Sequence, residues 1–163
     1  MHSNPNDKTI LFKIAATADD FSEGKSLFQQ YAKSLDFDLS FQGFSDELEN
    51  INRQYNKPTG ALILATYKSI TIACTGIRAL TNDTAELKRM FVLPGYRGLK
   101  VGHKMLTFAI HTSKELGYKS IRLDTLPGMT AAIKLYLEFG FENILPYRFN
   151  PFPEAVFMEK TLT

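Results

Sequence analysis

The sequence is poor in cysteine and has no long apolar run. A single cysteine, Cys74, excludes an internal disulfide framework. It lies among apolar residues in the stretch 70–77, so we expect a buried structural thiol rather than a nucleophile. No run approaches the roughly 18 apolar residues of a membrane-spanning helix, so we expect no membrane partner. Residues 1–8 are polar and lack the apolar region of a signal peptide, which favours a cytoplasmic location.

Excess charge is also nearly absent. The chain has 19 Lys and Arg against 17 Asp and Glu, and no basic run, so we expect no nucleic-acid partner. No His, Cys and Asp residues show the spacing of metal ligands, so we expect no metal. With 163 residues, 44% of them hydrophobic, the chain is expected to form a single domain over 1–163.

What the sequence does contain is a succession of segments with strand and helix periodicity. Alternating or β-branched runs predict strands at 9–15, 61–67, 70–79, 84–92, 120–126, 141–145 and 155–162. Apolar residues at helical spacing predict helices at 19–35, from Ser45, at 101–116 and at 130–139. This order of elements predicts an α/β fold with a mixed sheet.

The segment 86–103 is the most informative. A strand ends at a Pro-Gly turn, and the residues 97–102, Arg-Gly-Leu-Lys-Val-Gly, lead into an amphipathic helix. The first amides of a helix have no partner within the helix, and the dipole is positive there, so this pattern favours a phosphate site. Gly98 and Gly102 would let the backbone approach the ligand closely. The alternative is that the glycines only permit a tight turn and the basic residues face water.

In this setting the segment resembles the Arg/Gln-x-x-Gly-x-Gly/Ala signature of the GNAT superfamily, the acetyl-CoA-dependent N-acetyltransferases. Two further segments are similar to the family, residues 90–94 before the turn and 132–141 around Tyr136. The resemblance implies a central twisted mixed sheet of about seven strands with about four helices. It also implies an acyltransferase that moves an acetyl group from acetyl-CoA to a primary amine, by direct attack in a ternary complex.

The resemblance further implies a role for each matching residue. Backbone groups of Met90, Phe91 and Val92 would bind the acetyl carbonyl and the pantetheine arm. The backbone amides expected to hold the pyrophosphate are those of Arg97, Gly98, Leu99, Lys100, Val101, Gly102 and His103. Tyr136 would contact the cofactor and protonate the departing thiolate, and Glu86 would act as general base, directly or through water. The alternatives from the residues alone are that Tyr136 is a core tyrosine, that Glu86 is a surface strand residue, and that the amine arrives already neutral.

The sequence departs from the family pattern at two positions. Lys100 replaces the first glycine of the signature, which puts a side chain where the pyrophosphate would approach. Its amide is retained, and its ammonium could pair with a phosphate. Met129 stands where many members have an asparagine, so one polar contact to the cofactor is expected to be absent.

The acceptor is expected to bind between the segments 36–55 and 146–153, which carry several aromatic residues. Such walls suit a small-molecule amine, for example an amino acid, with Arg148 holding its carboxylate or phosphate. Alternatively, the aromatic residues pack in the core. Other functions left open are a protein or peptide N-acetyltransferase and a non-catalytic acyl-CoA sensor. A homodimer is also possible, through an exposed strand at 155–162.

Overall fold

The structure is a computed structural model that describes residues 9–163. The expectation about a signal peptide concerns residues 1–8 and lies outside the described residues. The strands are β1 (Ile10–Ile14), β2 (Ala61–Tyr67), β3 (Ile70–Ala79), β4 (Thr84–Val92), β5 (Ser120–Thr125), β6 (Glu142–Ile144) and β7 (Val156–Thr161). The helices are α1 (Ala18–Ser34), α2 (Phe44–Glu49), α3 (Ile51–Gln54), α4 (Val101–Glu115) and α5 (Thr130–Glu138), with 3₁₀ turns at Ser40–Gln42 and Pro94–Tyr96.

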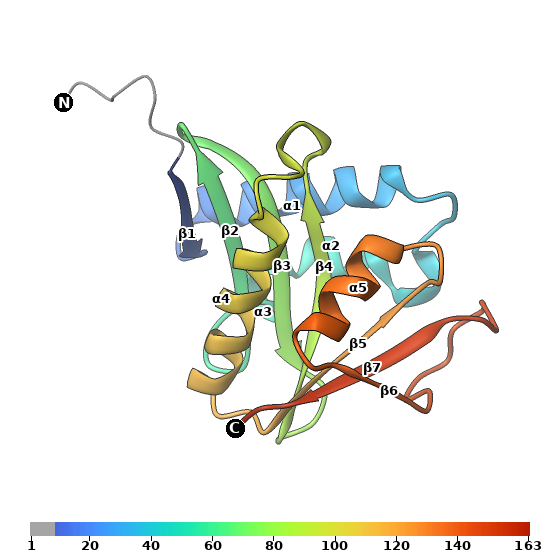
Figure 1. The fold of residues 1–163 in the computed structure, drawn as a ribbon. Coiled ribbons are helices and arrows are strands. Elements are labelled where there is room, and N and C mark those ends of the chain that lie inside the picture. The colour runs from blue at the N-terminus through green and yellow to red at the C-terminus, as the bar shows by residue number, and fades with distance from the viewer. Residues whose placement is uncertain (1–8) are drawn as a thin grey trace.

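The strands form one seven-stranded sheet in the order β1-β2-β3-β4-β5-β7-β6 (Figure 1). Every neighbouring pair is antiparallel except β4 and β5, which run parallel. The predicted mixed sheet of about seven strands is therefore confirmed. The predicted elements are all present, and α3 and the two 3₁₀ turns are additional to them.

The last strand, β7, does not lie at an edge of the sheet. It pairs with β5 along its whole length and with β6 on its other side. The expectation that the segment 155–162 is an exposed strand, able to pair with a second copy, is therefore wrong. Residues 157–159 have a strand partner on both sides. A homodimer stays a prediction, without this strand as its contact.

Helices cover both faces of the sheet and divide the core in two. α4 and α5 lie on one face in Figure 1, and α1, α2 and α3 lie on the other. Alternate residues of β2 serve the two sides: Ile63 belongs to the cluster under α4, and Leu64 to the cluster under α1. Cys74 is fully buried in the second cluster, where burial raises the pKa of its thiol, so the expected structural thiol is confirmed.

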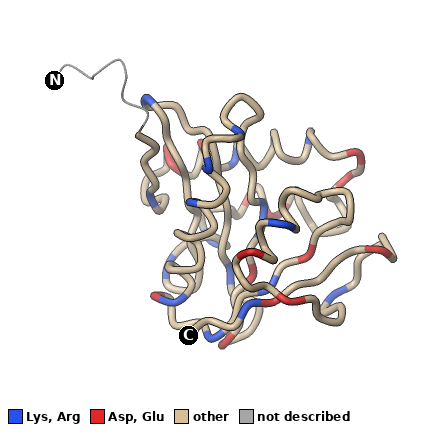
Figure 2. Tube along the Cα trace, viewed as in Figure 1, with Lys and Arg blue, Asp and Glu red and all other residues tan. Residues whose placement is uncertain are grey.

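The charged residues of both signs are spread along the trace in Figure 2, without a basic face. Within residues 9–163, no helix combines the length and the apolar character needed to cross a membrane.

The parallel pair β4 and β5 separates soon after it begins. Their pairing covers only Thr84–Glu86 with Ser120–Arg122. Beyond it the two strands diverge toward their C-terminal ends, as Figure 1 shows. Over the same stretch β4 bulges against β3, so that Arg89 and Met90 lie opposite Thr75. Arg89 has φ +58, a left-handed conformation that is unusual for a non-glycine residue.

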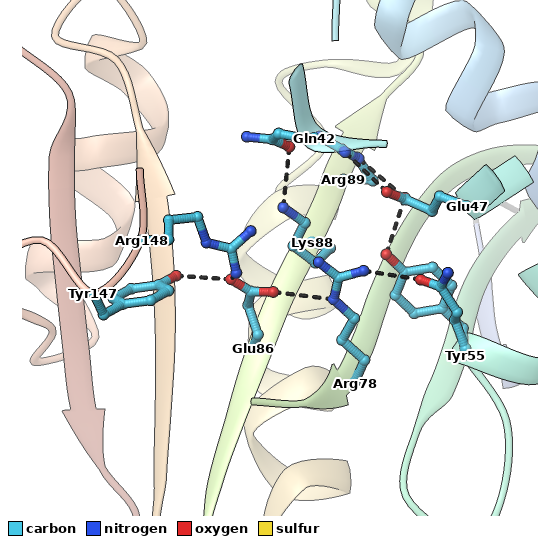
Figure 3. Close-up of polar contacts among 10 residues, drawn as sticks. Gln42, Glu47, Tyr55, Arg78, Glu86, Lys88, Arg89, Tyr147 and Arg148 are labelled. Atoms are coloured by element: carbon cyan, nitrogen blue, oxygen red, sulfur yellow. Dashed lines mark hydrogen bonds and ion pairs between the residues drawn. The ribbon is translucent and has the colours of Figure 1, made fainter. Parts of the chain in front are cut away.

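A buried ion pair holds the bulged residue in place (Figure 3). Arg89 donates from Nε to Glu47 Oε2 at 3.1 Å and from Nη2 to Glu47 Oε1 at 2.9 Å, and Tyr55 donates to the same carboxylate at 2.9 Å. Burial alone would raise the pKa of Glu47, but the hydrogen bonds and charge of Arg89 outweigh burial and lower it. The pair thus fixes α2 to the diverging part of β4.

Replacing Glu47 with glutamine should therefore lower the free energy of unfolding at pH 7 by about 3–5 kcal/mol, because Arg89 is left buried without a countercharge. The folded pKa of Glu47 lies below its ordinary value of 4.5, so its contribution is present above that pH and is lost as the pH falls. Denaturant unfolding of wild type and E47Q at pH 7 and pH 3.5 should show the difference shrinking in acid. E49Q, at an exposed position of the same helix, is the control, and an equal loss there would contradict the prediction.

Candidate functional site

The turn between β4 and α4 exposes free backbone donors. Residues 97–100 are exposed, and α4 begins at Val101 with no side chain capping its first amides. A 15-residue helix with an uncapped N-terminus offers several N–H groups and the positive end of its dipole to an anion. The local geometry is therefore suited to an anion, and the binding of a phosphate there stays a prediction.

The two glycines of this turn are needed for different reasons. Gly98 has φ +92, a conformation that side chains rarely adopt, so the turn itself requires it. Gly102 is not required by packing, because a Cβ there would meet only Leu135 Cδ2, at an ordinary 3.6 Å. The space above Gly102 is open, which fits a close approach of a phosphate to the helix.

The basic side chains around this turn are not all directed to it. Arg97 folds back to β4, where its Nε donates to the carbonyl oxygen of Val92 at 3.1 Å and its guanidinium lies 5.9 Å from the Phe91 ring. The ring of His103 packs against Phe139, with centroids 4.7 Å apart. Local charge at the helix N-terminus therefore depends less on these two side chains than the sequence indicates.

Tyr136 lies on α5 and is buried, with 6% of its surface exposed. Its ring packs against Phe141, and within residues 9–163 its hydroxyl has no hydrogen-bond partner. Burial, with a smaller contribution from Tyr31, raises the pKa of Tyr136, so the phenol stays protonated at neutral pH. The structure thus provides a protonated phenol whose O–H is available as a donor.

Glu86 is fully buried and held by three side chains (Figure 3). Its Oε1 accepts a hydrogen bond from Arg78 Nε at 3.0 Å, and its Oε2 accepts one from Tyr147 at 2.9 Å and pairs with Arg148. Glu86 therefore ties β3 and β4 to the loop between β6 and β7. Its role as general base stays a prediction.

The structure corrects the expectation for Arg148. Its guanidinium is paired with Glu86, and it lines a separate hollow together with Arg53 and Arg78. The pocket described next, which both expected acceptor segments line, does not include it. The sequence offers no signal for this pairing, because Glu86 and Arg148 lie on distant segments.

A pocket opens where β4 and β5 separate. Its walls are formed by Tyr31, Phe37, Leu39, Phe41, Gln42, Leu87, Lys88, Arg89, Asp124, Thr125, Leu126, Met129, Asn150 and Phe152. Both segments expected to surround an acceptor, 36–55 and 146–153, contribute to it. They meet through three phenylalanine rings, Phe37, Phe41 and Phe152, with centroids 4.7–6.4 Å apart. We call these three rings the phenylalanine roof.

Sequence analysis did not single out two charged residues of this pocket, Lys88 and Asp124. Lys88 is only 4% exposed, and its Nζ donates to Gln42 Oε1 at 3.1 Å (Figure 3). Burial, and then the charge of Arg89, lower the pKa of Lys88 to about 7. The available signal was the position of Lys88, two residues after Glu86 and therefore on the same face of β4. Within residues 9–163, no group of three or more His, Cys, Asp or Glu side chains is placed to hold a metal ion.

Comparison with known sequences identifies relatives along most of the chain. The model of the Acetyltransferase (GNAT) family matches residues 26–141. An uncharacterized N-acetyltransferase of Schizosaccharomyces pombe is 38% identical over 148 residues, which cover 90% of this chain and 89% of that protein. An uncharacterized N-acetyltransferase of Escherichia coli is 30% identical and covers 68% of each chain.

Solved structures share the fold. A GNAT-family acetyltransferase from Staphylococcus aureus superposes with a TM-score of 0.78 and 28% identity, covering 95% of this chain and all of that one. The PaiA N-acetyltransferase from Thermoplasma acidophilum, in complex with coenzyme A, has a TM-score of 0.69 and 16% identity, with coverage of 94% and 99%. At that identity the second likeness concerns the fold alone.

The backbone of Lys100 is strained, because it has φ +58 at the N-cap of α4, a conformation that glycine adopts at a lower cost in free energy. The variant K100G should raise the free energy of unfolding by about 0.5–1 kcal/mol, measured by denaturant unfolding. K104G, in the first turn of the same helix, removes a similar side chain from helical backbone and should lower it by about 1 kcal/mol. Destabilisation by both variants to the same extent would contradict the strain at Lys100.

Proposed function

The chain belongs to the Acetyltransferase (GNAT) family and is an N-acetyltransferase, and we propose that it transfers an acetyl group from acetyl-CoA to a primary amine of a small molecule. The observation that carries this proposal is the uncapped N-terminus of α4, which lies after the strand that diverges from β5. The unpaired part of β4 therefore leads directly into the helix N-terminus that can bind an anion. We also propose that 1–163 acts as one domain.

Acetyl-CoA would be held by the residues named from the sequence. Its pyrophosphate would bind to the backbone amides of 97–103, with Gly102 leaving room for it. Its pantetheine arm would run along Met90, Phe91 and Val92, on the part of β4 that β5 leaves unpaired. Backbone donors on that edge have no strand partner, which supports their use for a ligand.

When bound, acetyl-CoA supplies a thioester, so that attack by a neutral amine forms a C–N bond, breaks the C–S bond and releases a thiolate. Tyr136 would hold the proton for that sulfur. Tyr136 would give its proton to the sulfur and regain one from solvent, while the proton lost by the nitrogen would pass to Glu86 or to water. The protons then balance, and no covalent enzyme intermediate is needed. Positioning of the two substrates and polarisation of the carbonyl by backbone amides would supply most of the rate.

Glu86 is the predicted route for the proton that leaves the amine. Both its oxygens already accept hydrogen bonds, and two guanidinium groups face it. Such surroundings also support a positioning role, in which Glu86 fixes the loop before β7 against β4. Both roles require the carboxylate to remain charged in the folded protein.

The phenylalanine roof supports a small acceptor rather than a polypeptide. Its rings join the segment after α1 to the loop after β6 and so cover one side of the pocket. A peptide would need an open groove past these rings, which favours a small amine as the acceptor.

The first test is binding of acetyl-CoA, measured by thermal shift and calorimetry. At about 100 times Kd, acetyl-CoA should raise Tm by about 5–10 °C. G102A should bind acetyl-CoA roughly tenfold more weakly, because a methyl group enters the space above the helix N-terminus, yet fold at least as stably. G95A adds the same methyl outside the site and is the control. Unchanged affinity in G102A would remove the proposed pyrophosphate site.

The second test addresses Tyr136. The variant Y136F should lower kcat about a hundredfold, because the sulfur loses its proton donor, while the affinity for acetyl-CoA changes little. Release of CoA with a panel of amines gives kcat, and calorimetry gives the affinity. Y67F, which removes a phenol elsewhere in the sheet, is the control. An unchanged kcat in Y136F would show that Tyr136 is only a core residue and not the proton donor.

A further inference from the structure

Lys88 is a buried cation without a carboxylate partner. Its side chain comes from β4 into the pocket between the separating strands, and only 4% of the residue is exposed. Within residues 9–163, its Nζ has one hydrogen-bond partner, the neutral Gln42, and no ion pair. An ammonium group has three donors, and burying one without an anion is costly. The occupant of this pocket is therefore expected to bring a negative charge.

The other cation of the pocket does not share this property. The charge of Arg89, on β4, is neutralised by Glu47, on α2, through two hydrogen bonds. The guanidinium groups of Arg78 and Arg148 pair with Glu86 outside the pocket. Of the two cations that line the pocket, Lys88 is thus the one whose N–H donors are not all used by the described residues.

Asp124 presents the opposite charge from the facing strand. The last parallel pair is Glu86 with Arg122, so continuing that register by two residues would bring Lys88 opposite Asp124. Because the strands have separated, the two side chains line one pocket without forming an ion pair. Among residues 9–163, the Asp124 carboxylate accepts one hydrogen bond, a long one of 3.4 Å from Asn150 Nδ2. Its remaining acceptor positions are available to a ligand.

Resting on the proposed function, we propose that the acceptor is an amino acid, an amine that carries its own carboxylate. Its carboxylate binds to Lys88 Nζ, its amino group binds at Asp124, and its side chain packs under the phenylalanine roof. The two charges of such a zwitterion match the two unpaired charges of the pocket, one from each separating strand. An amine without a carboxylate would leave Lys88 buried and unpaired.

This assignment also accounts for the surroundings of Lys88. Burial lowers the pKa of Lys88 to about 7 in the protein alone, and a carboxylate beside Nζ would favour the protonated form again. Binding of the carboxylate therefore restores the charge that burial disfavours. The pairing disfavours acceptors that offer a second cation at this position, because like charges would meet beside a buried ammonium group.

The test compares amino acids with the amines formed by removing their carboxylate. L-Phenylalanine is paired with 2-phenylethylamine, and L-leucine with 3-methylbutylamine, within a panel of the common L-amino acids. Turnover is followed by CoA release, and binding to the enzyme saturated with CoA is measured by calorimetry. The variant K88M keeps the length of the side chain and removes its charge, so it should fold at least as stably as wild type. K114M, at an exposed position of α4, is the control.

Wild type should prefer an amino acid over its matched amine by about 10- to 100-fold in kcat/KM, and K88M should abolish that preference by losing kcat/KM for the amino acid more than for the amine. D124N should weaken both members of a pair, because both carry the amino group. Equal losses for amino acid and amine in K88M, or a panel in which no amino acid binds or reacts, would overturn the proposal. Failure to bind acetyl-CoA would instead refute the proposed function. The two failures are distinguishable, because binding of the amino acid can be measured separately.

Discussion

The short parallel contact between β4 and β5 is the constraint on which the rest of the molecule depends. Three residue pairs join the two strands, and their divergence then leaves one edge of β4 and one of β5 without partners. In an ordinary sheet such edges would be paired or covered, because unpaired backbone groups are costly. Here they border the pocket on one side of the sheet and lead to the N-terminus of α4 on the other. Fold and site therefore have the same origin.

Ionic contacts inside the protein hold this opening in shape. The Glu47–Arg89 pair secures the bulge of β4 to α2, and Glu86 secures the start of the opening to the loop before β7. Each carboxylate is buried and receives at least two charged or phenolic donors. Buried pairs of this kind contribute little net stability but penalise any arrangement in which one partner is lost. They make the position of the diverging strands specific.

The periodicity of the sequence was sufficient to predict the elements and their order. Strand β2 begins with an uninterrupted apolar stretch, β3 is rich in apolar and β-branched residues, and α4 and α5 have one apolar face each, so local pattern and tertiary burial agree. Strand β4 is different, because it carries the charged residues Glu86, Lys88 and Arg89. The turn at 97–102 was predictable because glycine and helix start are local signals. The partners of Glu86 could not be predicted, because Arg148 reaches it from a proline-rich loop whose sequence has no strand or helix periodicity. Lys88 resembled a surface lysine, and only the fold shows that the strand face it occupies is covered.

The place of β7 has a consequence for how the chain is made. β7 is last in sequence, yet it lies between β5 and β6 and provides hydrogen bonds to both. During synthesis the strands β1 to β4 can pair as soon as each emerges, because their neighbours in the sheet are their neighbours in sequence. β6 has no strand to pair with until residues 156–161 have left the ribosome. The half of the sheet that contains β5, β6 and β7 is thus completed in a single late step.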